Sequence, residues 1–293
     1  MKKRVMFDWF VGGIKTSRPV LWLVNLASLI IGVIAGGGGS LFQVKYLFAA
    51  ILVSFPYSLF VYSINDYYDA ESDSINTRKG GAFGLKYKKE GLDILKLYSF
   101  IGFIVTLIGL SVISKGVVGI YLLISMLLYL YSANPIRLKA IPVVDFVVGG
   151  GIFVMSSGLF GYLMSGNTVG SLLADFPIGL FSLFAIGMIM HLIGAIFDIE
   201  SDKSANMMTS AVFFGYRKMA WFGIIISIVS VLFAKVNIFY SFLTLVAGGL
   251  AGLQLFSSIR ESDFFKIFMM KLFIIAFFLL VFGMSLVDMN YLR

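Results

Sequence analysis

Apolar runs long enough to cross a lipid bilayer recur along the whole chain, and they constrain its fold more than any other feature. The hydrocarbon core of a bilayer is about 30 Å thick, so an α-helix needs about 20 apolar residues to cross it. Backbone groups in lipid find no water to bond, and each run is therefore expected to be a helix. The nine predicted spans are 18–36, 44–65, 92–114, 117–134, 142–164, 173–197, 218–234, 238–257 and 266–287.

The composition agrees with a membrane environment. Hydrophobic residues make up 59% of the chain and charged residues 13%, whereas soluble domains are roughly half apolar and a quarter charged. No polar half is left over for a soluble domain, so we predict an all-α membrane protein with one domain over residues 1–293. Cysteine is absent, which excludes disulfides and thiolate metal sites.

The formal net charge of +8 reports membrane topology, because the basic residues lie in short connections between spans. We therefore predict no nucleic-acid partner. With nine alternating crossings, most Lys and Arg fall on the side of the N-terminus. Cytoplasmic loops are enriched in these residues, so the N-terminus is predicted to be cytoplasmic. The opposite side receives Lys45, Lys115, Lys235 and Arg293.

Two acidic clusters lie at the cytoplasmic ends of the second and sixth spans. Residues 69–73 and 198–202 both read Asp-x-Glu-Ser-Asp, which makes a duplicated four-helix unit plausible. If the second span continues as a helix, Asp66, Asp69 and Asp73 share one face. Like charges at a helix C-terminus repel each other and the helix dipole, so a cation is expected to compensate them.

The paired acids predict a magnesium site. Mg²⁺ prefers carboxylate oxygens and binds through one or two carboxylates plus substrate phosphates. A single acid at a loop start is better explained as a solvated residue, but the repeated spacing favours a metal-bridged diphosphate. The predicted ligands, which are also the predicted catalytic acids, are Asp66, Asp69, Asp73, Asp198 and Asp202. Basic residues of the same layer, expected to hold phosphate oxygens, are Arg78, Lys79, Arg137, Lys139 and Lys203.

These motifs resemble those of the UbiA superfamily of intramembrane prenyltransferases, and the resemblance covers nearly the whole chain. Asn65 opens a complete Asn-Asp-x-x-Asp-x-x-x-Asp motif, and Asp198 opens the second motif, Asp-x-x-x-Asp. Residues 131–139 are similar to the family stretch Tyr-Ser-x-Pro-Pro-x-Arg-Leu-Lys, with Asn134 in place of the first proline. Arg18-Pro19 also resembles a family position.

The resemblance implies a helical bundle around a central cavity, with both motifs binding Mg²⁺ and an isoprenyl diphosphate, and prenyl transfer to a hydrophobic acceptor in the cell membrane. The active site is expected to face the cytoplasm. Residues 65–81 and 191–202 look most like the carotenoid (lycopene) elongase branch, although Phe197 stands where proline is expected. Aromatic or quinone-precursor acceptors and glycerolipid acceptors remain alternatives.

An allylic cation formed in such a reaction needs protection from water and stabilisation by aromatic faces. Tyr62, Tyr67, Tyr68 and Tyr131 lie near the motifs, and ordinary packing is the alternative role for each of them. His191, the single histidine, lies about two helical turns deeper than Asp198 on the same face. It is a candidate general base or substrate hydrogen-bond donor, or else a structural polar group.

Two other classes compete with an enzyme. A cation-coupled transporter also uses intramembrane acids, but its sites lie near the bilayer midplane at broken helices, whereas these acids lie at the cytoplasmic boundary. A scaffold without chemistry would leave the matched spacing of the two motifs unexplained.

Overall fold

The computed structural model describes residues 2–75, 85–87, 91–233, 238–256 and 263–287. All regular secondary structure in these ranges is helical. The elements are α1 (Lys2–Thr16), α2 (Pro19–Ala35), α3 (Val44–Ser54), α4 (Pro56–Ile75), α5 (Leu92–Ile113), α6 (Lys115–Ser132), η2 (Leu138–Ala140), α7 (Val144–Phe146), η3 (Val147–Ile152), α8 (Phe153–Met164), α9 (Val169–Ala174), α10 (Ile178–Ser204), α11 (Ser210–Phe233), α12 (Ile238–Leu253) and α14 (Asp263–Val287).

The predicted all-helical class is confirmed, and the number of nine spans stays a prediction. Within the described ranges, α1 and α2 form a further candidate span with a 55° bend between them. The last two predicted spans coincide with shorter apolar helices, Ile238–Leu253 and Met270–Phe282. In the part of the chain that the structure describes, 6 helices are long and apolar enough to cross a bilayer, namely Val44–Glu71, Leu92–Ile113, Lys115–Ser132, Val144–Met164, Ile178–Ser204 and Ser210–Phe233.

The ends of several helices differ from the prediction. The helix that carries the first acidic motif, α4, continues to Ile75, and α10 continues to Ser204. Hydropathy predicts that both helices end too early. It registers the polar residues of their last turns, but it does not register the protein groups that pack around those residues. The predicted span 173–197 starts late, at α10, because Pro177 at its N-cap separates it from α9. Helix α1 is not predicted, because its charged residues interrupt the apolar run, although its second half, Trp9–Thr16, joins α2 in the bent candidate span.

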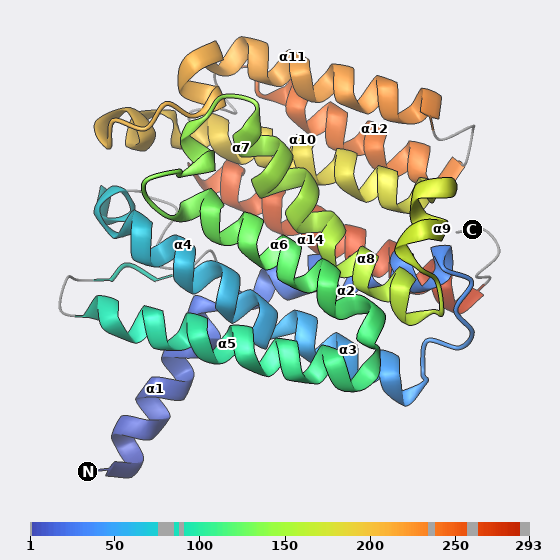
Figure 1. Cartoon of the computed structure of the whole chain (residues 1–293). Coiled ribbons are helices and arrows are strands. Elements are labelled where there is room, and N and C mark those ends of the chain that lie inside the picture. The colour runs from blue at the N-terminus through green and yellow to red at the C-terminus, as the bar shows by residue number, and fades with distance from the viewer. Residues whose placement is uncertain (1, 76–84, 88–90, 234–237, 257–262, 288–293) are drawn as a thin grey trace.

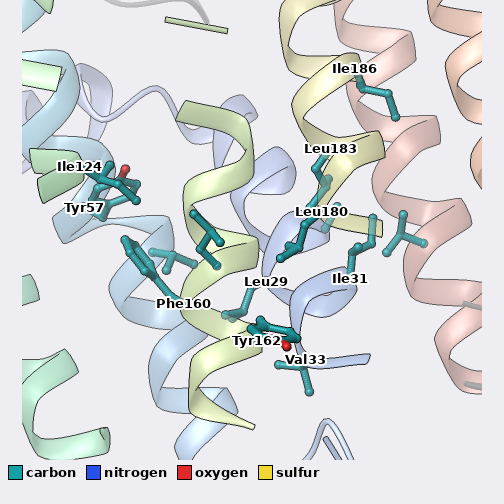
Figure 2. Close-up of a cluster of buried hydrophobic side chains, with 14 of the residues drawn as sticks. Leu29, Ile31, Val33, Tyr57, Ile124, Phe160, Tyr162, Leu180, Leu183 and Ile186 are labelled. Atoms are coloured by element: carbon teal, nitrogen blue, oxygen red, sulfur yellow. The ribbon is translucent and has the colours of Figure 1, made fainter. Parts of the chain in front are cut away.

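The helices form one bundle, from which α1 projects (Figure 1). At its centre α2 packs against α8 so closely that a Cβ on Gly32 would lie 1.9 Å from the carbonyl oxygen of Gly158. Small residues allow such backbone contact between helices in a membrane. Leu29, Phe160 and Leu183 fill the core among α2, α8 and α10 (Figure 2).

A second close contact positions the functional site. The π-helical segment η3 contains Gly150, where a Cβ would lie 2.5 Å from the carbonyl oxygen of Gly187 in α10. That Cβ would also lie 2.7 Å from the Cβ of His191. Short π-helical segments are frequent at functional sites. Here the segment brings the backbone of one span directly against the helix that carries the second acidic motif.

Candidate active site

The last turns of α4 place the first motif inside the protein. Because the helix continues through the motif, the predicted spacing holds and Asp66, Asp69 and Asp73 share one buried face, with 1%, 9% and 8% of their surface exposed. Buried carboxylates require charged or hydrogen-bonding partners. The structure supplies them from two separate segments.

Arg18, at the bend between α1 and α2, is the first partner. Its Nη2 lies 2.6 Å from Oδ1 of Asp66 and donates to Oδ1 of Asn65 at 3.3 Å. The guanidinium carbon lies 4.2 Å above the ring centre of Tyr62. Asp66 is thus neutralised by a cation that is itself 12% exposed.

Asp69 is held by the segment between α6 and α7. Arg137 Nη2 lies 3.1 Å from its Oδ1, Lys139 Nζ pairs with the same oxygen, and Asn65 Nδ2 donates to Oδ2 at 2.9 Å. Burial lowers the pKa of Lys139 below its usual value, while the charge of Asp69 acts in the opposite direction. The predicted compensation of the acids by cations is therefore present in the structure.

Arg18 and Arg137 also share an uncommon backbone conformation. Their φ angles are 53° and 43°, in the left-handed region that residues other than glycine seldom adopt. Such strain persists only where the surrounding structure fixes it, and it concentrates at functional sites. The fold therefore holds both arginines against the first motif at a conformational cost.

The second motif lies at the end of α10. Asp202 accepts a hydrogen bond from Oγ1 of Thr209 at 3.0 Å. Lys203 instead pairs with the exposed Glu200 at 3.3 Å, away from both cavities described below. Of the five predicted basic residues, Arg78 and Lys79 lie outside the described residues.

The two motifs meet at a polar cavity of about 270 Å³. Carboxylates of both helices line it, and Asp66 pairs with Arg18, which is one of its lining residues. The charged residues that line the polar cavity are Arg18, Asp69, Asp73, Lys139, Asp145, Asp198 and Asp202.

An apolar cavity of about 260 Å³ adjoins the polar one. Its walls include Tyr62, Phe153, Ile186 and Phe273, and most of its lining is hydrophobic. Because seven residues line both, the two cavities share one wall. These shared residues are Arg18, Leu21, Asn65, Tyr131, Met190, His191 and Met270.

His191 and Tyr131 lie at this shared wall, where the hydroxyl of Tyr131 is 3.5 Å from Nε2 of His191. The predicted position of His191, deeper than Asp198 on the same face, matches this arrangement. Tyr67 and Tyr68 contact each other edge to face with ring centres 5.0 Å apart, and neither lines the polar or the apolar cavity. Of the four candidate tyrosines, the structure therefore brings Tyr62 and Tyr131 to the cavities.

Asp145 lines the polar cavity and was absent from the predicted site. It accepts hydrogen bonds from the backbone N–H groups of Phe146 and Ser210, both at 2.8 Å, and from the Ser210 hydroxyl. It thereby ties the start of α7 to the start of α11. The available signal was an acid inside a predicted apolar span, since an ionisable residue there is a functional candidate.

The donor chemistry of the polar cavity fits Mg²⁺. Among the described residues, no three acidic or histidine side chains form a ready-made metal cage. Mg²⁺ does not need one, because substrate phosphates and waters complete its octahedron around one or two carboxylates. Asp69, Asp73, Asp198 and Asp202 supply hard oxygen donors to the cavity, and its basic residues supply hydrogen-bond donors for phosphate. The metal-ligand assignments remain predictions.

Fold and cavities together define an apolar helical bundle with a charged chamber beside a hydrophobic one. The model of the UbiA prenyltransferase family matches residues 25–274, and the chain belongs to this family of prenyltransferases. The family and enzyme class predicted from the motifs are confirmed.

Relatives and solved structures agree with this assignment. The chain is 31% identical over 205 residues to a lycopene elongase/hydratase of Corynebacterium glutamicum, covering 69% of each chain. It is 27% identical over 189 residues to a digeranylgeranylglyceryl phosphate synthase of Methanosphaera stadtmanae, covering 63% of each. A UbiA homolog from Archaeoglobus fulgidus, solved with GPP and Mg²⁺, shares the fold with a TM-score of 0.69 at 19% identity, over 93% of this chain and 98% of that one.

Proposed function

We propose that this protein is a Mg²⁺-dependent prenyltransferase that moves an isoprenyl group from an allylic diphosphate to a neutral hydrocarbon acceptor, a carotenoid such as lycopene. The observation that carries the proposal is the shared wall between a charged cavity and an apolar one. A prenyl diphosphate has the same division into an anionic head and a hydrophobic chain. Its reacting carbon, which joins the two, would lie at the shared wall.

In this proposal the diphosphate occupies the polar cavity. Bound Mg²⁺, held by Asp66, Asp69, Asp73, Asp198 and Asp202, would neutralise the diphosphate and improve it as a leaving group. Arg137 and Lys139, which now hold Asp69, would donate to phosphate oxygens. The homolog from Archaeoglobus fulgidus supports this arrangement because it was solved with GPP and Mg²⁺ and also with DMAPP and Mg²⁺.

The prenyl chain and the acceptor occupy the apolar cavity. Breaking the allylic C–O bond leaves a cation that the hydrophobic lining shields from water and that the ring faces of Tyr62 and Tyr131 stabilise. Attack by an acceptor double bond forms the new C–C bond and moves the positive charge to the acceptor. The pair of His191 and Tyr131 lies where a proton could then be accepted from the adduct.

The charge of the apolar cavity favours a neutral acceptor. Among its described lining residues, Arg18 is the one formally charged side chain, and Asp66 offsets that charge. An aromatic acid or a glycerolipid phosphate would bring a negative charge into this cavity without a free cation to meet it, at a large desolvation cost. The similarity to lycopene elongase/hydratases points in the same direction.

Two alternative functions within the same enzyme class differ from this proposal in the acceptor. The similarity to digeranylgeranylglyceryl phosphate synthases supports a glycerolipid acceptor, and the superfamily resemblance also allows an aromatic acid. Membership of a prenyltransferase family decides against the transporter. Uptake of a solute into proteoliposomes that depends on Asp69 or Asp198 would nevertheless support the transporter function.

The test is an acceptor comparison with purified protein in lipid nanodiscs. Labelled dimethylallyl or geranylgeranyl diphosphate is supplied with Mg²⁺ and with lycopene, 4-hydroxybenzoate or geranylgeranylglyceryl phosphate. We expect a labelled, heavier carotenoid in the lycopene reaction and none when a chelator removes Mg²⁺. Product from another acceptor would reassign the substrate, and no product from any pair would refute prenyl transfer to these acceptors.

A further inference from the structure

The bend between α1 and α2 determines the direction of one side chain, that of Arg18. Arg18 has a left-handed φ of 53°, directly before Pro19 starts α2. Thr16 is buried and hydrogen-bonds the hydroxyl of Tyr87, while Trp22 Nε1 donates to the backbone oxygen of Ser17 at 3.0 Å. The turn is thus fixed on both sides of Arg18, and the guanidinium is directed inward.

The guanidinium occupies a position where a predicted metal ligand needs a cation. Oδ1 of Asp66 lies 2.6 Å from Arg18 Nη2, and the carboxylate is 1% exposed. A charge buried this deeply is strongly destabilising without a partner. Mg²⁺ and the guanidinium are both cations seeking the same carboxylate, so binding of one weakens binding of the other.

Arg18 also lines the polar cavity, together with Asp69, Asp73 and Lys139. A guanidinium carries five donors in a planar fork that matches phosphate oxygens. The side chain therefore has a second anionic partner available once a diphosphate enters. Its stacking on Tyr62 can support the guanidinium in either arrangement.

We propose that Arg18 is an exchangeable counter-cation of Asp66. It pairs with this carboxylate in the metal-free enzyme and turns to diphosphate oxygens when Mg²⁺ and the diphosphate enter together. The inference rests on the proposed function, since it requires the Mg²⁺–diphosphate site. Arg18 then opposes the binding of bare Mg²⁺ and favours the binding of the metal–diphosphate complex.

The test measures thermal unfolding of purified protein, which needs no catalysis. The unfolding temperature is followed with a chelator, with increasing Mg²⁺, and with increasing inorganic pyrophosphate at fixed Mg²⁺. The variants are Arg18→Gln, which removes the charge, and Arg18→Lys, which keeps it without the fork. Arg217→Gln is the matched control, because Arg217 is exposed and contacts the neighbouring Tyr216.

We expect Arg18→Gln to unfold at lower temperature in chelator, because the buried ion pair between Arg18 and Asp66 is lost. The Mg²⁺ midpoint is the Mg²⁺ concentration that gives half of the full rise in unfolding temperature, and the pyrophosphate midpoint is defined in the same way. The Mg²⁺ midpoint should fall by about fivefold or more, and the pyrophosphate midpoint should rise by a similar factor, which is the usual size of coupling between two binding events. Arg18→Lys should leave the Mg²⁺ midpoint near that of the wild type and raise the pyrophosphate midpoint. Arg217→Gln should match the wild type in all three conditions.

Opposite movement of the two midpoints distinguishes exchange from a structural role. If both midpoints rise in Arg18→Gln, or neither moves, the exchange is refuted. If Arg18→Gln does not fold, an unchanged pyrophosphate midpoint in Arg18→Lys refutes it equally. A wild-type protein that Mg²⁺ and pyrophosphate do not stabilise at all would instead count against the proposed function.

Discussion

Asp69 combines a structural and a chemical role, and the two can be separated by substitution. Its Oδ1 holds both Arg137 and Lys139. Asp69→Asn leaves these cations without their carboxylate, so we expect a loss of about 3 kcal/mol in the free energy of unfolding. We also expect turnover to fall about a hundredfold, a typical cost for losing one electrostatic contact in an active site.

The double variant Asp69→Asn/Lys139→Met removes both charges of the buried pair. It should regain much of the stability and none of the turnover, as measured by denaturant unfolding and by product formation. Asp93→Asn, on an exposed acid paired with Lys96, should leave both quantities unchanged. Recovery of turnover in the double variant would show that Asp69 serves the fold and not the chemistry.

His191 tests whether the shared wall of the cavities takes part in the reaction. If its Nε2, 3.5 Å from the Tyr131 hydroxyl, accepts a proton, His191→Ala should lower kcat about a hundredfold. Stabilisation by Mg²⁺ and pyrophosphate should change little, because the variant keeps the carboxylates and the basic side chains that line the polar cavity. Met190→Leu alters the same wall conservatively and should keep its turnover. Full turnover in His191→Ala would leave His191 as a structural polar group.

At the scale of the helix, the close contact between η3 and α10 determines the shape of the apolar cavity. A Cβ on Gly187 would lie 2.4 Å from the carbonyl oxygen of Gly150, and both residues line that cavity. Gly187→Ala should therefore cost about 1–3 kcal/mol of stability through overpacking and also lower turnover. Gly249→Ala and Gly119→Ala meet no atom within 4 Å and should change stability by no more than about 1 kcal/mol. Equal effects at all three positions would contradict the packing argument.

The sequence predicts the apolar interiors of the helices well, because membrane solvation leaves the backbone few alternatives. It predicts the ends of α4 and α10 less well, because their acids contact groups from elsewhere in the chain. These groups are basic side chains at α4 and the Thr209 hydroxyl at α10. The motif spacing placed Asp69 and Asp198 on neighbouring helix ends correctly. The sequence marks Arg18 only as a position similar to one in the family, since nothing in it says that the turn before Pro19 directs this side chain to Asp66.

At the scale of the whole molecule, the site and the topology depend on each other. Both acidic motifs and the basic segment around Lys139 lie around one polar cavity. The glycine-rich turn after α2 is tied instead to the turn after α8, where Asn167 Nδ2 donates to the backbone oxygen of Gly36 at 2.7 Å. In the predicted topology these two groups of residues lie on opposite sides of the membrane. The basic residues of the first group would then place the site on the cytoplasmic side.

The absence of cysteine from the chain allows this orientation to be measured directly. Ser40, in the turn after α2, and Ser204, at the end of α10, are both exposed, so a single cysteine at either position is accessible to a reagent. In intact cells, a membrane-impermeant maleimide should label Ser40→Cys and leave Ser204→Cys unlabelled, and permeabilised cells should label both. Labelling of Ser204→Cys alone in intact cells would show that the protein has the opposite orientation in the membrane. The diphosphate chamber would then open to the outside, where cytoplasmic prenyl diphosphates could not reach it.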